Sequence, residues 1–114
     1  MLVVWEPILP SDWRPPGGRV LARLPDERAR QFWDSNHLVA KALSDFAKQK
    51  PNQPQPDCCV QKGFNWDEVI LYGPHSQWHD TPTAVFWSGP VVRAVPNLET
   101  AFKEQLGPGK SAYR

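Results

Sequence analysis

Two adjacent cysteines are the residues of this chain best suited to covalent chemistry. Cys58 and Cys59 are its only cysteines, and they follow a stretch rich in proline and glutamine in which a loop is expected. A loop leaves thiols accessible to other thiols and to oxidants. Adjacent cysteines can form a vicinal disulfide, bind a soft metal ion, or stay reduced with one packed beneath the loop, which is the state we expect. Both are therefore redox candidates.

Histidines downstream of these cysteines raise the question of a metal site. Adding His75 and His79 would complete a set of two cysteines and two histidines. Zinc sites normally separate the two ligands of each pair by two to four residues, and adjacent cysteines rarely both reach one tetrahedral ion. The chain also lacks a Walker A motif, a dinucleotide fingerprint and a nucleophile elbow. We expect no metal and no cofactor.

Among the carboxylates, Glu6 is the most interesting because it ends an apolar, strand-like run. Ligands of open sheets gather beyond the carboxyl ends of strands. Burial there would raise the pKa of Glu6 and suit it to act as a proton shuttle, whereas the alternative is that Glu6 caps a neighbouring turn. Asp67 and Glu68 allow the same two interpretations. His37 is expected to be a solvent-exposed residue at the start of a helix.

The elements that position these residues alternate along the chain. Thirteen prolines divide the sequence into short segments, which excludes a long-helix architecture. Apolar, β-prone runs predict strands, one-sided apolar stripes predict helices, and Asn97 is the expected N-cap of the last helix. The opening run is apolar enough for a strand buried on both faces. Strands are predicted at residues 2–8, 30–33, 66–72 and 84–87, the last two antiparallel, and helices at 18–24, 37–49 and 97–106.

This order and several short motifs resemble the thioredoxin-like superfamily, in particular a family of uncharacterised bacterial proteins. The resemblance lies in Val-Val-Trp-Glu-Pro at 3–7, Phe-Trp-Asp at 32–34, Trp-Asp-Glu-Val-Ile-Leu-Tyr at 66–72 and the closing helix. It covers residues 2–106. It implies an α/β fold, with a mixed sheet and flanking helices. We expect residues 1–106 to form one partial domain and residues 107–114 a flexible tail.

The chain departs from that superfamily where its enzymes keep the reactive sulfur. They place a Cys-x-x-Cys motif, or a selenocysteine variant, after the first core strand and at a helix N-terminus, where the thiol pKa is lowered. In this alignment that βα unit would precede Met1. No active-site cysteine is carried over, so the resemblance implies an N-terminally truncated remnant of a thiol or selenol redox domain, inactive on its own.

Composition limits the partners that we expect. The formal net charge is +1, which favours neither nucleic acid nor an anionic membrane. No run approaches the length of a membrane span, and no signal peptide follows Met1, so the chain as written is expected in the cytoplasm, although a longer parent could be exported. The alternative to an inactive remnant is a non-catalytic binding domain that associates with a partner or a second copy through an exposed sheet edge.

Overall fold

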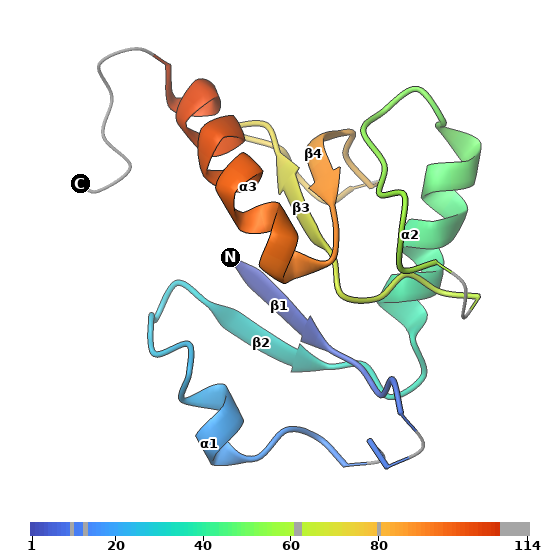
Figure 1. Cartoon of the computed structure of the whole chain (residues 1–114), viewed down its shortest axis with the longest axis vertical. Coiled ribbons are helices and arrows are strands. Elements are labelled where there is room, and N and C mark those ends of the chain that lie inside the picture. The colour runs from blue at the N-terminus through green and yellow to red at the C-terminus, as the bar shows by residue number, and fades with distance from the viewer. Residues whose placement is uncertain (10, 13, 61–62, 80, 108–114) are drawn as a thin grey trace.

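Strands and helices alternate along the chain in the predicted order. The computed structural model describes residues 1–9, 11–12, 14–60, 63–79 and 81–107. Within them the protein is α/β, as predicted. Of the tail expected at residues 107–114, residues 108–114 lie outside the described residues. Figure 1 labels the elements, which are β1 (Leu2–Trp5), α1 (Gly18–Leu21), β2 (Arg30–Trp33), α2 (Leu38–Gln49), β3 (Val69–Tyr72), β4 (Ala84–Ser88) and α3 (Val91–Leu106).

The described strands form two small sheets. β1 and β2 are parallel, with Leu2 opposite Arg30 and Trp5 opposite Trp33. β3 and β4 are antiparallel, as predicted from the sequence. The expectation of one mixed sheet is wrong for the described residues, because no hydrogen-bonded ladder joins the two pairs. Strands of four or five residues give each pair few positions at which to add another neighbour.

The opening strand is covered on one face, whereas the sequence predicted burial on both. Leu2 is 57% exposed and Phe32 is 51% exposed, and Val4 lies with them on the outer face of the β1–β2 pair. Trp5 and Trp33 are half-buried on the opposite face. An apolar run indicates a strand, but periodicity alone does not reveal whether a second layer covers it.

The best-buried part of the molecule surrounds Trp87 in β4. The Trp87 side chain is only 3% exposed, and α3 packs against β3 and β4 (Figure 1). Ala84 and Ala94, in the strand and the helix respectively, are also buried. Their small side chains allow the helix and the hairpin to approach closely around the large indole ring.

Helix α3 begins six residues earlier than predicted, so the assignment of Asn97 as its N-cap is wrong. The backbone N–H of Val91 donates to Oδ1 of Asp67 at 3.3 Å, and the carbonyl of Pro90 accepts the first helical hydrogen bonds. Pro96 lies inside the helix. A proline has a helical φ angle and removes a single N–H donor, so a helix anchored well at its start can include one.

Asp34 joins three elements at the end of β2. Its backbone N–H donates to the carbonyl of Trp5 at 2.7 Å, which ties it to the end of β1. Its carboxylate oxygens accept the N–H groups of Leu38 and Val39 at 2.9 and 2.8 Å. These N–H groups belong to the first turn of α2. The N–H groups of a first turn have no carbonyl acceptors within the helix itself. The buried Asp34 therefore fixes where α2 begins relative to the parallel strands.

We expect the substitution Asp34→Ala to lower the free energy of unfolding by about 1–2 kcal/mol, because two helix N–H groups lose their acceptor. Urea unfolding followed by circular dichroism measures the change. Ser35→Ala, at the exposed neighbouring position, serves as the control and should be close to neutral. Equal stability of the two variants would contradict the capping role.

Candidate functional site

The candidate site lies at the carboxyl ends of the parallel strands. Glu6 directly follows β1, and Asp34 directly follows β2. Because the strands are parallel, both residues lie at the same edge of the sheet, where ligands of α/β proteins commonly bind. The connection between α2 and β3 reaches this edge, since Phe64 of that connection packs against His37.

Glu6 and His37 form a shielded pair at this edge. Glu6 Oε2 lies 3.0 Å from His37 Nδ1, and the two side chains are only 11% and 17% exposed. The rings of His37 and Phe64 stack with their centroids 3.7 Å apart. Burial raises the pKa of Glu6, although the hydrogen bond and charge of His37 act in the opposite direction. The direction of this shift agrees with the sequence-based expectation, whereas the expected exposed position of His37 is wrong.

Glu68 is the second unusual carboxyl group. Its Oε2 accepts hydrogen bonds from Asn65 Nδ2 at 3.0 Å and from Trp87 Nε1 at 2.8 Å. Its Oε1 is buried and has no hydrogen-bond partner among the described residues. Burial raises the pKa of Glu68 to about 7, assisted by the carboxylates of Glu6 and Asp67 and opposed by the two hydrogen bonds. Oε2 is thus a double acceptor, and burial favours the neutral form of the carboxyl group.

Cys58 and Cys59 are joined by a disulfide bond, in contrast to the reduced pair expected from the sequence. Cys59 is buried, with 4% of its surface exposed, and its carbonyl oxygen accepts the N–H of Trp66 at 3.0 Å. Cys58 is only half-buried. Cys58 is therefore the more exposed residue of the pair.

Gly89 brings the disulfide and Glu68 together. A Cβ atom at position 89 would lie 3.3 Å from Sγ of Cys58, 3.2 Å from Cγ of Glu68 and 2.7 Å from the backbone oxygen of Asp67. The absence of a side chain at Gly89 therefore lets the sulfur of Cys58 and the Glu68 side chain approach the same point of the backbone. The Cys58 sulfur and the side chain of Glu68, whose carboxyl group titrates near neutral pH, therefore share one neighbour, and this placement can couple sulfur chemistry to proton transfer.

The histidines considered as metal ligands take no part in this site. His75 and His79 lie in the connection between β3 and β4, and Nε2 of His79 lies 3.1 Å from Oε1 of Gln77. Across the described ranges, no group of three or more histidine, cysteine, aspartate or glutamate side chains is arranged to hold a metal ion.

Sequence reasoning singled out some members of the site and missed others. The cysteines and Glu6 were proposed, and Glu68 was considered with less support. Asn65, Trp87 and Gly89 were not considered for it, because a lone amide, a core tryptophan and a glycine after a strand carry no local signal of function. Their importance depends on contacts between segments that are distant in sequence.

Comparisons with protein-family models, curated proteins and solved structures find no match to this chain. None of the helices among the described residues combines the length and the apolar character needed to cross a membrane. The proposed function therefore rests on the geometry of the site.

The substitution Glu68→Gln should remove part of the pH dependence of stability. In the folded protein the pKa of Glu68 is about 7, against 4.5 for an ordinary glutamate, so the folded state holds the proton more tightly. The contribution of Glu68 to stability is then present below pH 4.5 and falls as the pH rises towards 7. Glutamine retains an oxygen acceptor for Asn65 and Trp87 but cannot ionise.

The pH dependence is tested by urea unfolding at about pH 5 and about pH 7.5. Most of the titration of Glu68 falls between these two pH values. The wild type should lose stability relative to Glu68→Gln as the pH rises. Glu99→Gln, at an exposed position of α3, serves as the matched control. If the stability difference between wild type and Glu68→Gln is the same at both pH values, the assigned titration is wrong.

Proposed function

We propose that this chain is a thioredoxin-like domain that carries out thiol–disulfide exchange at Cys58 and Cys59, with Glu68 as the proton donor and acceptor. The observation that carries the proposal is the position of the Cys58 sulfur and the Glu68 side chain against the same residue, Gly89. The pKa of Glu68, raised to about 7, makes proton transfer possible in both directions near neutral pH.

The proposed reaction reduces the protein disulfide with two substrate thiols. A substrate thiolate attacks Sγ of Cys58, the bond between Cys58 and Cys59 breaks, and Cys59 leaves as a thiolate that takes up a proton. A second substrate thiolate then attacks the substrate sulfur of the mixed disulfide, which releases a substrate disulfide and the Cys58 thiolate. The neutral Glu68 carboxyl donates its proton to that thiolate, and the reverse sequence oxidises the pair.

The order of the elements supports the thioredoxin-like part of the proposal. A β-α-β unit with parallel strands is followed by α2 and then by an antiparallel hairpin with α3 packed on it. This is the order on which the resemblance in the sequence rests. The proposal differs from the inactive remnant expected from the sequence, because the cysteines present here lie beside a proton-exchanging group.

Thiol counting with and without reductant tests the proposed reaction. After treatment with dithiothreitol, the full chain should yield two titratable thiols, and these should equilibrate reversibly with mixtures of reduced and oxidised glutathione. Cys59→Ser should trap a mixed disulfide on Cys58, whereas Cys58→Ser should react about tenfold or more slowly because Cys59 is buried.

Glu68→Gln provides the test of the proton donor, with Glu99→Gln as the control. The exchange rate of the wild type and of the control should show a pH step near 7, which Glu68→Gln should lack. The redox proposal is wrong if Cys58 and Cys59 stay oxidised under excess reductant, or if they are reduced but do not reoxidise. An unchanged pH profile in Glu68→Gln would remove only the role of that carboxyl group.

A second candidate function is supported by the uncovered face of the β1–β2 sheet. Leu2, Val4 and Phe32 are exposed together on this face. Parallel sheets normally have both faces covered, and a two-stranded sheet alone is marginally stable. We propose that a second copy of the chain covers this face, which would make the protein a non-catalytic association domain.

Sedimentation velocity over a wide range of concentrations separates this candidate from a monomeric enzyme. The wild type should sediment faster as its concentration rises, and Phe32→Glu should abolish that change by placing a charge on the face. Val92→Glu, an equally drastic change at an 81% exposed site on α3, should have no effect. A wild type that remains monomeric throughout would rule out self-association.

A further inference from the structure

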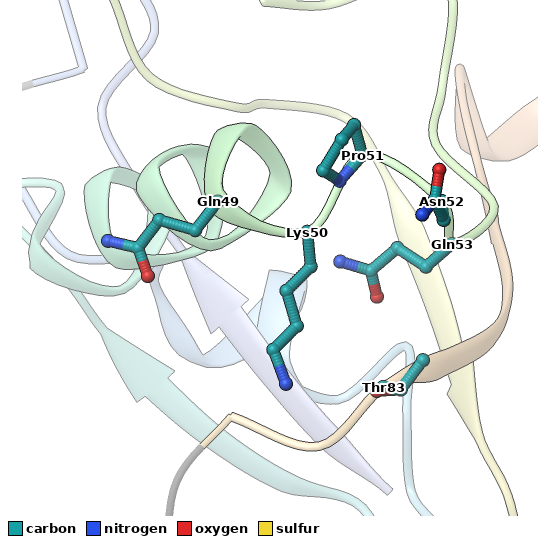
Figure 2. Close-up of a pocket in the computed structure, with 6 residues that line it drawn as sticks. All are labelled: Gln49, Lys50, Pro51, Asn52, Gln53 and Thr83. Atoms are coloured by element: carbon teal, nitrogen blue, oxygen red, sulfur yellow. The ribbon is translucent and has the colours of Figure 1, made fainter.

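A hollow that plays no part in the disulfide site lies where α2 ends. It has a volume of about 340 Å³ and is lined by Gln49, Lys50, Pro51, Asn52, Gln53 and Thr83 (Figure 2). The chain here turns away from the helix, while Thr83 comes from the segment just before β4. The polar lining side chains are three amides, an ammonium and a hydroxyl, with no carboxylate among the described lining residues.

Gln53 supplies the main observation at this hollow. Its side chain is fixed, because Oε1 accepts the backbone N–H of Ala84, the first residue of β4, at 3.0 Å. Since that donor requires an oxygen, the orientation of the amide is determined and Nε2 must point the other way. Gln53 is 9% exposed, and Nε2 is buried without a hydrogen-bond partner in the described structure. A buried donor without an acceptor is costly and is rarely retained without a role.

Lys50 adds a positive charge to the lining of the hollow. Figure 2 shows its side chain extending alongside the Gln53 amide, with Thr83 across from both. The Lys50 ammonium lies 5.6 Å from the ring centroid of Phe46. Lys50 is exposed, and long exposed side chains exchange rotamers rapidly, so an incoming group can enter between the ammonium and the amide.

The end of a helix would normally repel an anion, because its last carbonyl groups carry partial negative charge. Here Nε2 of Gln55 donates to the carbonyl oxygens of Ala47 and Lys50, at 2.8 and 3.3 Å. These hydrogen bonds offset the partial negative charges at the end of α2.

We propose that this hollow is a binding site for a small oxyanion, either a carboxylate or a phosphate group. One oxygen of the anion accepts a hydrogen bond from Nε2 of Gln53, and the Lys50 ammonium pairs with the negative charge. The hydroxyl of Thr83 donates from the opposite wall. Charge-assisted hydrogen bonds of this kind are the stronger ones in proteins, and the anion satisfies the donor left unpaired in the free protein.

Titration of the full chain with sodium phosphate and, separately, with sodium acetate tests the site. At constant ionic strength, nuclear magnetic resonance should show saturable shifts of the Gln53 side-chain amide signals and of the Thr83 backbone signal. Saturation by phosphate alone, by acetate alone or by both supports the site and identifies which oxyanion it accepts. The absence of saturable shifts with either salt overturns the proposal.

Two variants and a control locate the binding. Lys50→Met should weaken the anion affinity about tenfold or more by removing the charge. Gln53→Glu keeps an oxygen for the Ala84 N–H but replaces the free donor with a negative charge, so it should abolish binding. Lys48→Met removes an exposed charge from the last turn of α2, outside the lining, and should retain binding. Unchanged affinity in Lys50→Met, or an equal loss in Lys48→Met, contradicts the assignment.

Discussion

The carboxyl group of Glu68 occupies the junction between β4 and the connection that follows α2. One of its oxygens accepts hydrogen bonds from both Trp87 and Asn65, so the largest buried side chain and a buried loop residue share one acceptor. Removing it would leave two donors without partners in the best-packed region. The Cγ atom of the same side chain lies close to Gly89, as does the sulfur of Cys58. The Glu68 side chain therefore both stabilises the fold and forms part of the site. This double role limits the residues that can replace it.

Buried polar residues carry much of the structural order in this protein, because its apolar core is small. Asp34 positions α2 on the ends of the parallel strands, and Gln53 fixes the first residue of β4. Asn65 holds the carboxyl group of Glu68 in place through a hydrogen bond. Each of the three organises a segment of the chain through side-chain hydrogen bonds. These hydrogen bonds explain how a chain with thirteen prolines and short strands keeps long connections in defined positions.

The sequence predicted what is encoded locally and missed what depends on distant contacts. The order of elements and the antiparallel hairpin were predicted, because apolar runs and turn residues report them directly. The start of α3 was wrong, since Pro96 resembles a helix boundary while the acceptor that anchors Val91 comes from Asp67. A raised pKa for Glu6 was anticipated from its place after a strand. The pairing of Glu68 with Trp87 and the contacts of Gly89 with Glu68 and Cys58 join segments about twenty to thirty residues apart, which no short motif records.

The local packing of α3 has a consequence for how the molecule folds. Strands β3 and β4 and helix α3 follow one another in the chain and pack together, so their contacts close short loops. β1 pairs with β2 across residues 6–29, a longer connection than residues 73–83 between β3 and β4, and so at a somewhat greater entropic cost. We expect the segment from β3 to α3 to form early as a cooperative unit and to exchange its amide hydrogens slowly, and the parallel pair to dock later. Glu68 lies just before β3 and Trp87 lies in β4, so one side of the disulfide site would then be in place before the edge that carries Glu6 and His37.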